Sequence, residues 1–160
     1  MKRQLASGYW NLNNLVVRAV VILLLLSIGL VAKSQEMQLS AIGNQKGSPS
    51  SMNFSELKSV FKGEKQRWPD GTKISIALMK TNNPVGQIIC KKIYDMSGDE
   101  LNKFWLALVF QGKVSAPNFF NSVDELEYFV AQNPGAIGIV NEQANTSAIK
   151  TLFINGKKTF

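Results

Sequence analysis

The side chains that most often carry out chemistry in enzymes are scarce in this sequence. It contains no histidine and a single cysteine, Cys90. The lack of histidine excludes Ser-His-Asp and Cys-His nucleophile activation, histidine-ligated zinc and any imidazole general base. One cysteine also excludes an internal disulfide framework and a cysteine-rich metal cluster. Because Cys90 follows Ile88 and Ile89 in a helical pattern, we expect a buried apolar residue without a catalytic role.

Two pairs of neighbouring carboxylates are present, and both fall at positions typical of a helix first turn. Asp99 with Glu100, and Asp124 with Glu125, each follow a serine that can cap a helix. Acidic side chains stabilise the positive end of a helix, which favours a structural role for both pairs over a catalytic one. Asp70 lies in a Trp-Pro-Asp-Gly turn, where aspartate commonly binds its own backbone. We therefore predict a protein that is not an enzyme and that uses no cofactor and no metal ion.

The basic residues do not predict a nucleic-acid surface. The chain has 18 basic and 11 acidic residues and a formal net charge of +7. Four of the basic residues lie in the first 34 positions, which hold no acid, so residues 35–160 carry a net charge of only +3. The pairs Lys91-Lys92 and Lys157-Lys158 are isolated in the sequence. The chain also has no stripe of alternating basic and aromatic residues that would suit single-stranded nucleic acid. A phosphate-binding GxxxxGK[ST] loop is absent as well.

One segment does have the composition of an anion site. Lys80-Thr81-Asn82-Asn83 leaves a predicted strand and enters a predicted helix that begins at Pro84. In open α/β sheets, ligands bind beyond the carboxyl ends of the strands, and the free backbone N–H groups of a helix N-terminus suit an anion. The candidate ligand-binding residues are therefore Lys80, Thr81, Asn82 and Asn83. Asn82 or Asn83 can also simply cap the helix, and the two roles are compatible.

The elements that must position this segment follow from hydrophobic spacing and from capping residues. Strands are predicted at 37–42, 73–79, 136–140 and 150–154, the last closed by an Asn155-Gly156 turn. Helices are predicted after Asn53, Asn83, Ser97 and Ser122. Residues 44–52 are expected to form a loop, and residues 114–120 an extended crossing segment. This alternation predicts an α/β fold with a mostly parallel sheet flanked by helices.

Two details of the predicted helices bear on later sections. The helix after Asn83 is expected to run to about Asp95. In the helix after Ser97, four apolar residues share one face and predict its buried side, namely Leu101, Phe104, Trp105 and Leu108.

The first 34 residues have the features of an export signal. Ala19 to Ala32 is an apolar run of 14 residues, shorter than the ~20 that a membrane-spanning helix needs. It follows a basic segment and ends in small residues, which predicts a signal peptide at residues 1–34 with cleavage between Ser34 and Gln35. An uncleaved membrane anchor is the alternative, although Arg18 interrupts its extension. We expect the remaining domain, residues 35–160, to be periplasmic or secreted.

Several of these segments together resemble one family. Phe61-Lys62-Gly63 followed by Trp68-Pro69-Asp70-Gly71 resembles the F-x-G … W-x-D-G signature of phosphate ABC transporter substrate-binding proteins. The pattern continues in order through Trp105, Phe110-Gln111-Gly112, Pro117 and Asn133-Pro134-Gly135-Ala136-Ile137-Gly138. The resemblance covers residues 36–155, nearly all of the chain beyond the signal segment.

The resemblance implies a periplasmic-binding-protein fold and a role in capturing an oxyanion. In that family the ligand lies between two α/β lobes, whereas residues 35–160 amount to about one lobe. Full-length members carry a basic residue and a Ser-Gly-Thr run where this chain has residues 80–86. Lys80 can supply a point charge but not the bidentate fork of arginine, and Pro84 removes a backbone donor.

We therefore predict a single periplasmic-binding-protein-like lobe that binds a small anion noncovalently, phosphate by resemblance, with a link to ABC-type uptake. Tight binding by one lobe requires a second surface, which a homodimer or an envelope protein can supply. The alternative is an interaction module of the cell envelope that no longer binds phosphate. For that alternative, Phe119-Phe120 is the candidate apolar patch, unless both rings are buried in the core.

Overall fold

The computed structural model describes residues 17–18, 37–141 and 146–160. The chain divides into two compact units, residues 1–36 and residues 37–160, and the fold described below is that of the second unit. Apart from residues 17–18, the predicted signal segment lies outside the described residues. Within the described ranges, no helix has both the length and the apolar character that crossing a bilayer demands.

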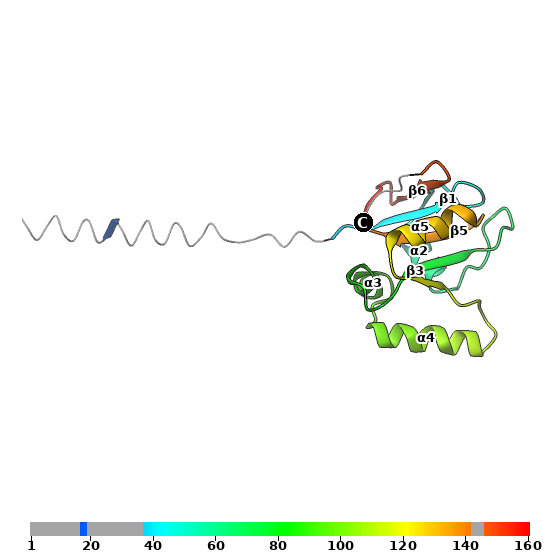
Figure 1. The fold of residues 1–160 in the computed structure, drawn as a ribbon, viewed down its shortest axis with the longest axis horizontal. Coiled ribbons are helices and arrows are strands. Elements are labelled where there is room, and N and C mark those ends of the chain that lie inside the picture. The colour runs from blue at the N-terminus through cyan, green and yellow to red at the C-terminus, as the bar shows by residue number, and fades with distance from the viewer. Residues whose placement is uncertain (1–16, 19–36, 142–145) are drawn as a thin grey trace, which may run out of the picture. The chain divides into compact units, whose positions relative to one another are not determined.

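A five-stranded sheet forms the centre of the second unit (Figure 1). In spatial order its strands are β4 (Asn118–Phe120), β3 (Ser75–Met79), β5 (Ala136–Val140), β1 (Ser40–Asn44) and β6 (Ile149–Thr151). Strand β3 pairs in parallel with β4 and β5, while β1 is antiparallel to both of its neighbours. Four of the five strands therefore run in one direction, which confirms the predicted mostly parallel α/β sheet.

The middle strand of the sheet, β5, is covered on both faces. All five of its residues, Ala-Ile-Gly-Ile-Val, are buried, as an uninterrupted apolar run predicts for a strand between two layers. Gly138 has a packing role there, because a Cβ atom at this position would lie 2.6 Å from Leu126 Cδ2. The missing side chain lets helix α5 (Val123–Gln132) lie close to the sheet. Strand β3 is also covered on both faces, since four of its five residues are buried.

The prediction of one strand at 150–154 is wrong, because the chain changes partners in the middle of this segment. Strand β6 pairs with β1, whereas β7 (Phe153–Ile154) pairs in parallel with β2 (Ser51–Met52). Strand β2 lies inside the segment 44–52, which was expected to be a loop. The Asn155-Gly156 turn after β7 is confirmed, with both residues at positive φ, 48° and 79°.

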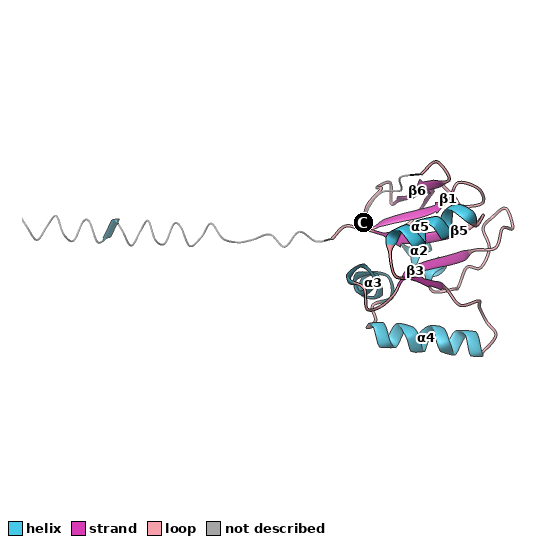
Figure 2. Cartoon of the chain, viewed as in Figure 1, coloured by secondary structure: helices cyan, strands magenta, loops and turns pink. Residues whose placement is uncertain are grey.

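Each helix begins at the capping residue that the sequence indicates. Asn53, Asn83, Ser97 and Ser122 cap α2 (Phe54–Phe61), α3 (Pro84–Ile89), α4 (Gly98–Phe110) and α5. Figure 2 shows α5 lying in front of the strands and α4 set apart from them. Helix α5 contacts every strand of the main sheet, whereas the main tertiary neighbour of α4 is the segment that precedes it.

That preceding segment is a π-helix, η1 (Cys90–Tyr94), which the sequence did not reveal. The helix predicted to run to about Asp95 does end there, at a left-handed residue with φ 56°, but its last part has the wider π hydrogen-bonding pattern. Cys90 is 2% exposed, which confirms its expected burial. The Tyr94 hydroxyl donates a hydrogen bond to the Phe61 carbonyl oxygen at 2.7 Å and so ties η1 to the end of α2.

Candidate functional site

The segment Lys80-Thr81-Asn82-Asn83 lies where two parallel strands end. Lys80 follows the last residue of β3 directly, and its backbone N–H donates to the carbonyl oxygen of Phe120, the last residue of β4, at 2.9 Å. The segment therefore stands beyond the carboxyl ends of adjacent parallel strands, the usual location of ligands in such sheets. Lys80 and Asn82 are exposed, whereas Thr81 and Asn83 are half-buried.

Asn83 serves the local structure. Its backbone N–H donates to the Lys80 carbonyl oxygen at 2.9 Å, and its Oδ1 accepts from the N–H of Val85 at the same distance. Its Nδ2 donates to the carbonyl oxygen of Asn121, just before α5, at 3.4 Å. Of the two residues expected as possible caps, Asn82 and Asn83, it is Asn83 that caps the helix, and these bonds fix the turn between β3 and α3.

Glycine allows a close approach behind the same turn. A Cβ atom on Gly86 would collide with the Lys80 carbonyl oxygen, so α3 can pack here only with glycine at this position. A Cβ atom on Gly98 would lie 2.8 Å from Thr81 Cβ, which places the first residue of α4 against the Thr81 side chain. The beginnings of α3, α4 and α5 thus all adjoin the Lys80–Asn83 turn.

Three neighbouring helix beginnings create a positive field, but several of their donors are already occupied. Pro84 has no N–H, and the N–H of Val85 binds Asn83. The N–H of Glu100 binds Ser97 Oγ at 3.3 Å, and Glu100 Oε2 accepts from the Ser97 backbone N–H and hydroxyl at 2.7 and 2.8 Å. These hydrogen bonds lower the pKa of Glu100 and keep it ionised. Within the turn, the polar side chains that remain exposed to solvent are those of Lys80 and Asn82.

Lys80 is the charged group of this turn, and it makes no ion pair within the part of the chain that the structure describes. An exposed ammonium beyond a strand end is chemically suited to a small oxyanion, which it can approach as a point charge. The turn alone covers one side of such a ligand. The turn is therefore a candidate for one side of a binding site.

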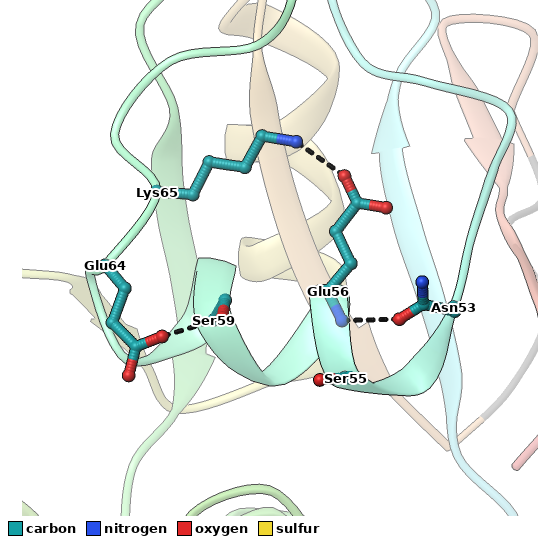
Figure 3. Close-up of a pocket in the computed structure, with 6 residues that line it drawn as sticks. All are labelled: Asn53, Ser55, Glu56, Ser59, Glu64 and Lys65. Atoms are coloured by element: carbon teal, nitrogen blue, oxygen red, sulfur yellow. Dashed lines mark hydrogen bonds and ion pairs between the residues drawn. The ribbon is translucent and has the colours of Figure 1, made fainter.

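A second candidate, along α2, carries the opposite charge balance. Figure 3 shows this open pocket of about 460 Å³, with Glu56 paired to Lys65 and Ser59 donating to Glu64. Two carboxylates against one ammonium make it unsuitable for an anion, and both carboxylates already have partners. The Glu56–Lys65 pair was not predicted from the sequence, because its residues lie nine positions apart across the end of a helix.

A third candidate is a cavity of about 190 Å³ at the amino ends of β3 and β4, at the opposite end of these strands from the Lys80 turn. Lys73 Nζ donates there to Ser115 Oγ at 3.0 Å, and Gln66 Nε2 donates to the Lys113 carbonyl oxygen at 2.7 Å. The polar groups at this end thus bind one another across the loop that leads to β4. The cavity was not predicted from the sequence.

Other residues singled out in the sequence have structural roles. Asp70 accepts a hydrogen bond from the N–H of Thr72 at 2.9 Å, which lowers the pKa of its carboxyl group. The Trp68 indole N–H donates to the Gly135 carbonyl oxygen at 2.9 Å and so joins two of the family-like motifs. The two acid pairs lie in the first turns of α4 and α5. Burial raises the pKa of the Cys90 thiol, which disfavours the reactive thiolate.

Among the described residues, no group of three or more histidine, cysteine, aspartate or glutamate side chains is placed to hold a metal ion. The expected apolar patch at Phe119-Phe120 is only partly present. Both rings are half-buried, and the Phe120 ring packs against Phe129 with centroids 5.2 Å apart. The large exposed apolar side chains lie elsewhere, and three of them, Leu106, Val109 and Phe110, are on α4.

Comparisons with known proteins identify the fold. No family model and no curated protein sequence matches the chain. Solved structures do match it. An ABC-type phosphate transport receptor from Vibrio cholerae is similar over 77% of this chain and 48% of its own, with a TM-score of 0.60 and 14% identity.

Two further structures give the same result. PstS from Borrelia burgdorferi matches with a TM-score of 0.54 and 15% identity over 75% of this chain and 48% of its own. A putative phosphate ABC transporter substrate-binding protein with bound phosphate from Clostridium perfringens matches with a TM-score of 0.50 and 13% identity, over 75% of this chain and 46% of its own.

The chain thus has the fold of one periplasmic-binding-protein-like lobe, as predicted. Its resemblance to phosphate ABC transporter substrate-binding proteins is confirmed at the level of the fold. The chain spans about half the length of the structures that it matches.

Proposed function

We propose that this protein is an exported, single-lobe binding protein that holds a small anion noncovalently, with phosphate as the first ligand to test. The observation that carries the proposal is the position of the exposed Lys80 ammonium beyond the carboxyl ends of β3 and β4. The fold shared with phosphate receptors supports phosphate as the choice of anion. A role in ABC-type uptake follows from the same similarity.

The four residues of the turn have different roles in this proposal. Lys80 supplies the positive charge, and the Thr81 hydroxyl and Asn82 amide supply hydrogen-bond donors to the oxyanion. Asn83 holds the turn in place through its bonds to Val85 and to the start of α5. No step of bond making or breaking is involved, so the protein acts by binding and release.

A single lobe leaves much of such a ligand in contact with water, whereas good small-molecule sites bury ~70–90% of it. We propose that a second surface completes the site, either another copy of the chain or an envelope protein. Export places the domain outside the cytoplasm, with residues 1–34 as the signal. Mass spectrometry of the protein recovered from cells would test this by showing whether its N-terminus is Gln35.

The test of anion binding is calorimetric titration of the protein, expressed from its full sequence, with phosphate and with sulfate as the comparison anion. We expect phosphate binding at micromolar strength, about −8 kcal/mol, and a loss of about tenfold or more in Lys80→Ala. Lys157→Ala, which removes an exposed lysine from the turn after β7, is the matched control and should bind normally. Unchanged affinity in Lys80→Ala would exclude the site, and no heat from folded protein would exclude the function.

An interaction module is the second candidate function, and one observation favours it. Helix α4 exposes Leu106, Val109 and Phe110 to solvent at 58, 39 and 83%. Apolar side chains that gather on one surface often mark a contact with another protein. If the folded protein does not bind phosphate, contact with another protein through this surface becomes the leading proposal for its function.

A further inference from the structure

The outward side of α4 is chemically uneven along its length. Its middle and end carry the exposed apolar residues Leu106, Val109 and Phe110, spaced three and four positions apart as on one helix face. Its beginning is polar, with exposed Asp99, Asn102 and Lys103. The face is therefore apolar from its centre toward the carboxyl end and charged toward the amino end.

The inward side of the same helix already has its partners. Leu101 and Trp105 are 2% and 3% exposed, and the Phe104 ring lies edge-on to Tyr94 with centroids 6.2 Å apart. Trp105 also packs against Gly63, where a Cβ atom would lie 3.2 Å from the indole ring. Burying the outward face against this lobe is thus excluded, because the helix cannot turn both sides inward.

Lys113 gives the far end of the face a positive charge. Helix α4 closes with a Schellman motif, in which the N–H of Lys113 donates to the Leu108 carbonyl oxygen at 3.2 Å and that of Gly112 to Val109 at 2.9 Å. The bond from Gln66 holds the Lys113 carbonyl in place. Both Lys113 and Asp99 are exposed, and neither takes part in an ion pair in the described ranges.

We propose that the outward face of α4 is the contact surface of a symmetric dimer, in which α4 lies antiparallel to α4 of a second copy. Asp99 precedes Leu106 by seven residues, about 10.5 Å along the helix, and Lys113 stands just beyond the Schellman turn that ends the helix. A two-fold axis at Leu106 places Asp99 beside the carboxyl end of the partner's α4, next to the turn that carries the partner's Lys113, and this approach occurs twice by symmetry. The face is therefore complementary to itself.

The same axis provides cover for the apolar side chains. Leu106 meets the partner's Leu106, while Val109 and Phe110 lie over the partner's Lys103 and the partner's Asn102. A lysine can bury its aliphatic stem against an apolar side chain and keep its ammonium in water. Parallel pairing would instead bring like charges together at both ends of the helix pair.

A contact made by one helix pair is smaller than the ~800 Å² per partner of a standard interface. We therefore expect weak dimerisation, with a dissociation constant of about 10–500 μM, that weakens as salt screens the charge pairs.

The dimer also bears on the anion site, and this part rests on the proposed function. Gly98, at the start of α4, contacts Thr81. The antiparallel arrangement brings the partner's Lys113 to that end of the helix, where it adds a positive charge beside the Lys80 turn. Dimerisation measured without phosphate does not depend on this point, so the two proposals can fail separately.

The test is sedimentation equilibrium of the protein as cells produce it, in low salt and without phosphate, over about 5 to 500 μM. Leu106→Asp should weaken association about tenfold or more, because it places two carboxylates at the axis. Tyr128→Asp, on the exposed side of α5, is the matched control and should associate like the natural protein.

Charge exchange tests the antiparallel register directly. Asp99→Lys and Lys113→Asp should each associate about fivefold more weakly, because each turns two attractive pairs into repulsive ones. An equal mixture of these two variants should recover the natural affinity, since both cross pairs are then attractive. Asp124→Lys makes the same change at the same helix position of α5 and should have no effect.

Each outcome decides the proposal. Recovery in the mixture, with the loss in Leu106→Asp, supports the antiparallel dimer. A monomer at every concentration would overturn it, as would a dimer that Leu106→Asp leaves intact. A monomer that binds phosphatidylglycerol vesicles through Leu106 would show that the face meets a membrane instead. Association without recovery in the mixture would overturn the antiparallel register.

Discussion

Helices α4 and α5 begin in the same way and end in different surroundings. Each starts at a serine whose hydroxyl accepts the N–H of a glutamate three residues later, and each has two acids in its first turn. Helix α5 then lies across the sheet and buries Leu126 and Val130 completely. Helix α4 is set apart from the labelled strands (Figure 1). Its main neighbour is η1, and half of its apolar residues are exposed to water.

The difference shows that an amphipathic pattern specifies a helix without specifying what covers it. In α5 the apolar residues form a narrow stripe, and the main sheet covers this stripe. In α4 the apolar residues extend around the helix, and the lobe covers only the side of Leu101 and Trp105. The surplus on the other side is the basis of the proposed dimer contact. The predictions below test the buried contacts of the two helices and then their beginnings.

Trp105→Ala should produce the largest loss. We expect the free energy of unfolding to fall by about 3–5 kcal/mol, because Trp105 is 3% exposed and its removal leaves a cavity between α4 and the rest of the lobe. Urea unfolding followed by circular dichroism measures the loss. Phe110→Ala, on the same helix and 83% exposed, should change stability by less than about 0.5 kcal/mol. Similar losses at both positions would contradict the two-sided description of α4.

Gly138→Ala should disturb the contact of α5 with the sheet. The added methyl group meets Leu126, and we expect a loss of about 1–3 kcal/mol from overpacking. A double-mutant cycle with Leu126→Ala measures the coupling, because the smaller side chain makes room for the methyl group. If the two losses were simply additive, the close approach of Leu126 to Gly138 would not limit the packing.

The caps of the two helices should differ slightly in strength. Ser97→Ala removes one member of a complete capping box and should cost about 1 kcal/mol. In α5, the Glu125 carboxylate accepts from the N–H of Asn121, one residue before the cap. We therefore expect Ser122→Ala to cost somewhat less in the same unfolding measurement. A larger loss at Ser122 would contradict the assignment of the stronger cap to α4.

Because of Glu100, the stability of the folded protein should depend measurably on pH in the acid range. Its pKa in the folded protein lies below its ordinary value of 4.5, because the backbone N–H and hydroxyl of Ser97 bind the carboxylate. The stabilisation is therefore present above about pH 4.5 and is lost as the pH falls through the lowered pKa. Between about pH 5 and 3, the natural protein should lose stability more steeply than Glu100→Gln does. Parallel pH profiles would exclude this contribution.

Much of the fold was predictable because its signals are local. A capping asparagine or serine acts on an N–H two or three residues away, and the Trp68 to Gly71 turn closes through a 2.9 Å bond between those residues. The position of the Lys80 turn beyond a strand end was predictable for the same reason. Whether an anion occupies it depends on an opposite wall, and one lobe supplies none.

The parts that were not predictable join residues far apart in the chain. Strands β2 and β7 pair across about a hundred residues, and their short sequences carry no periodic signal of their own. The approach of Thr81 to Gly98, and the half-burial of Phe119 and Phe120, likewise depend on which elements become neighbours.

The amino-acid sequence by itself determined the starts of the helices, the turns, the apolar strand at 136–140 and the exclusion of histidine chemistry. It did so because these features depend on residue type and on neighbours within one or two turns. The tertiary structure alone decided which apolar residues of α4 are covered, which strands share a sheet, and which charges face water. Burial is a property of the partner as much as of the residue, and only the assembled lobe shows where a partner is missing.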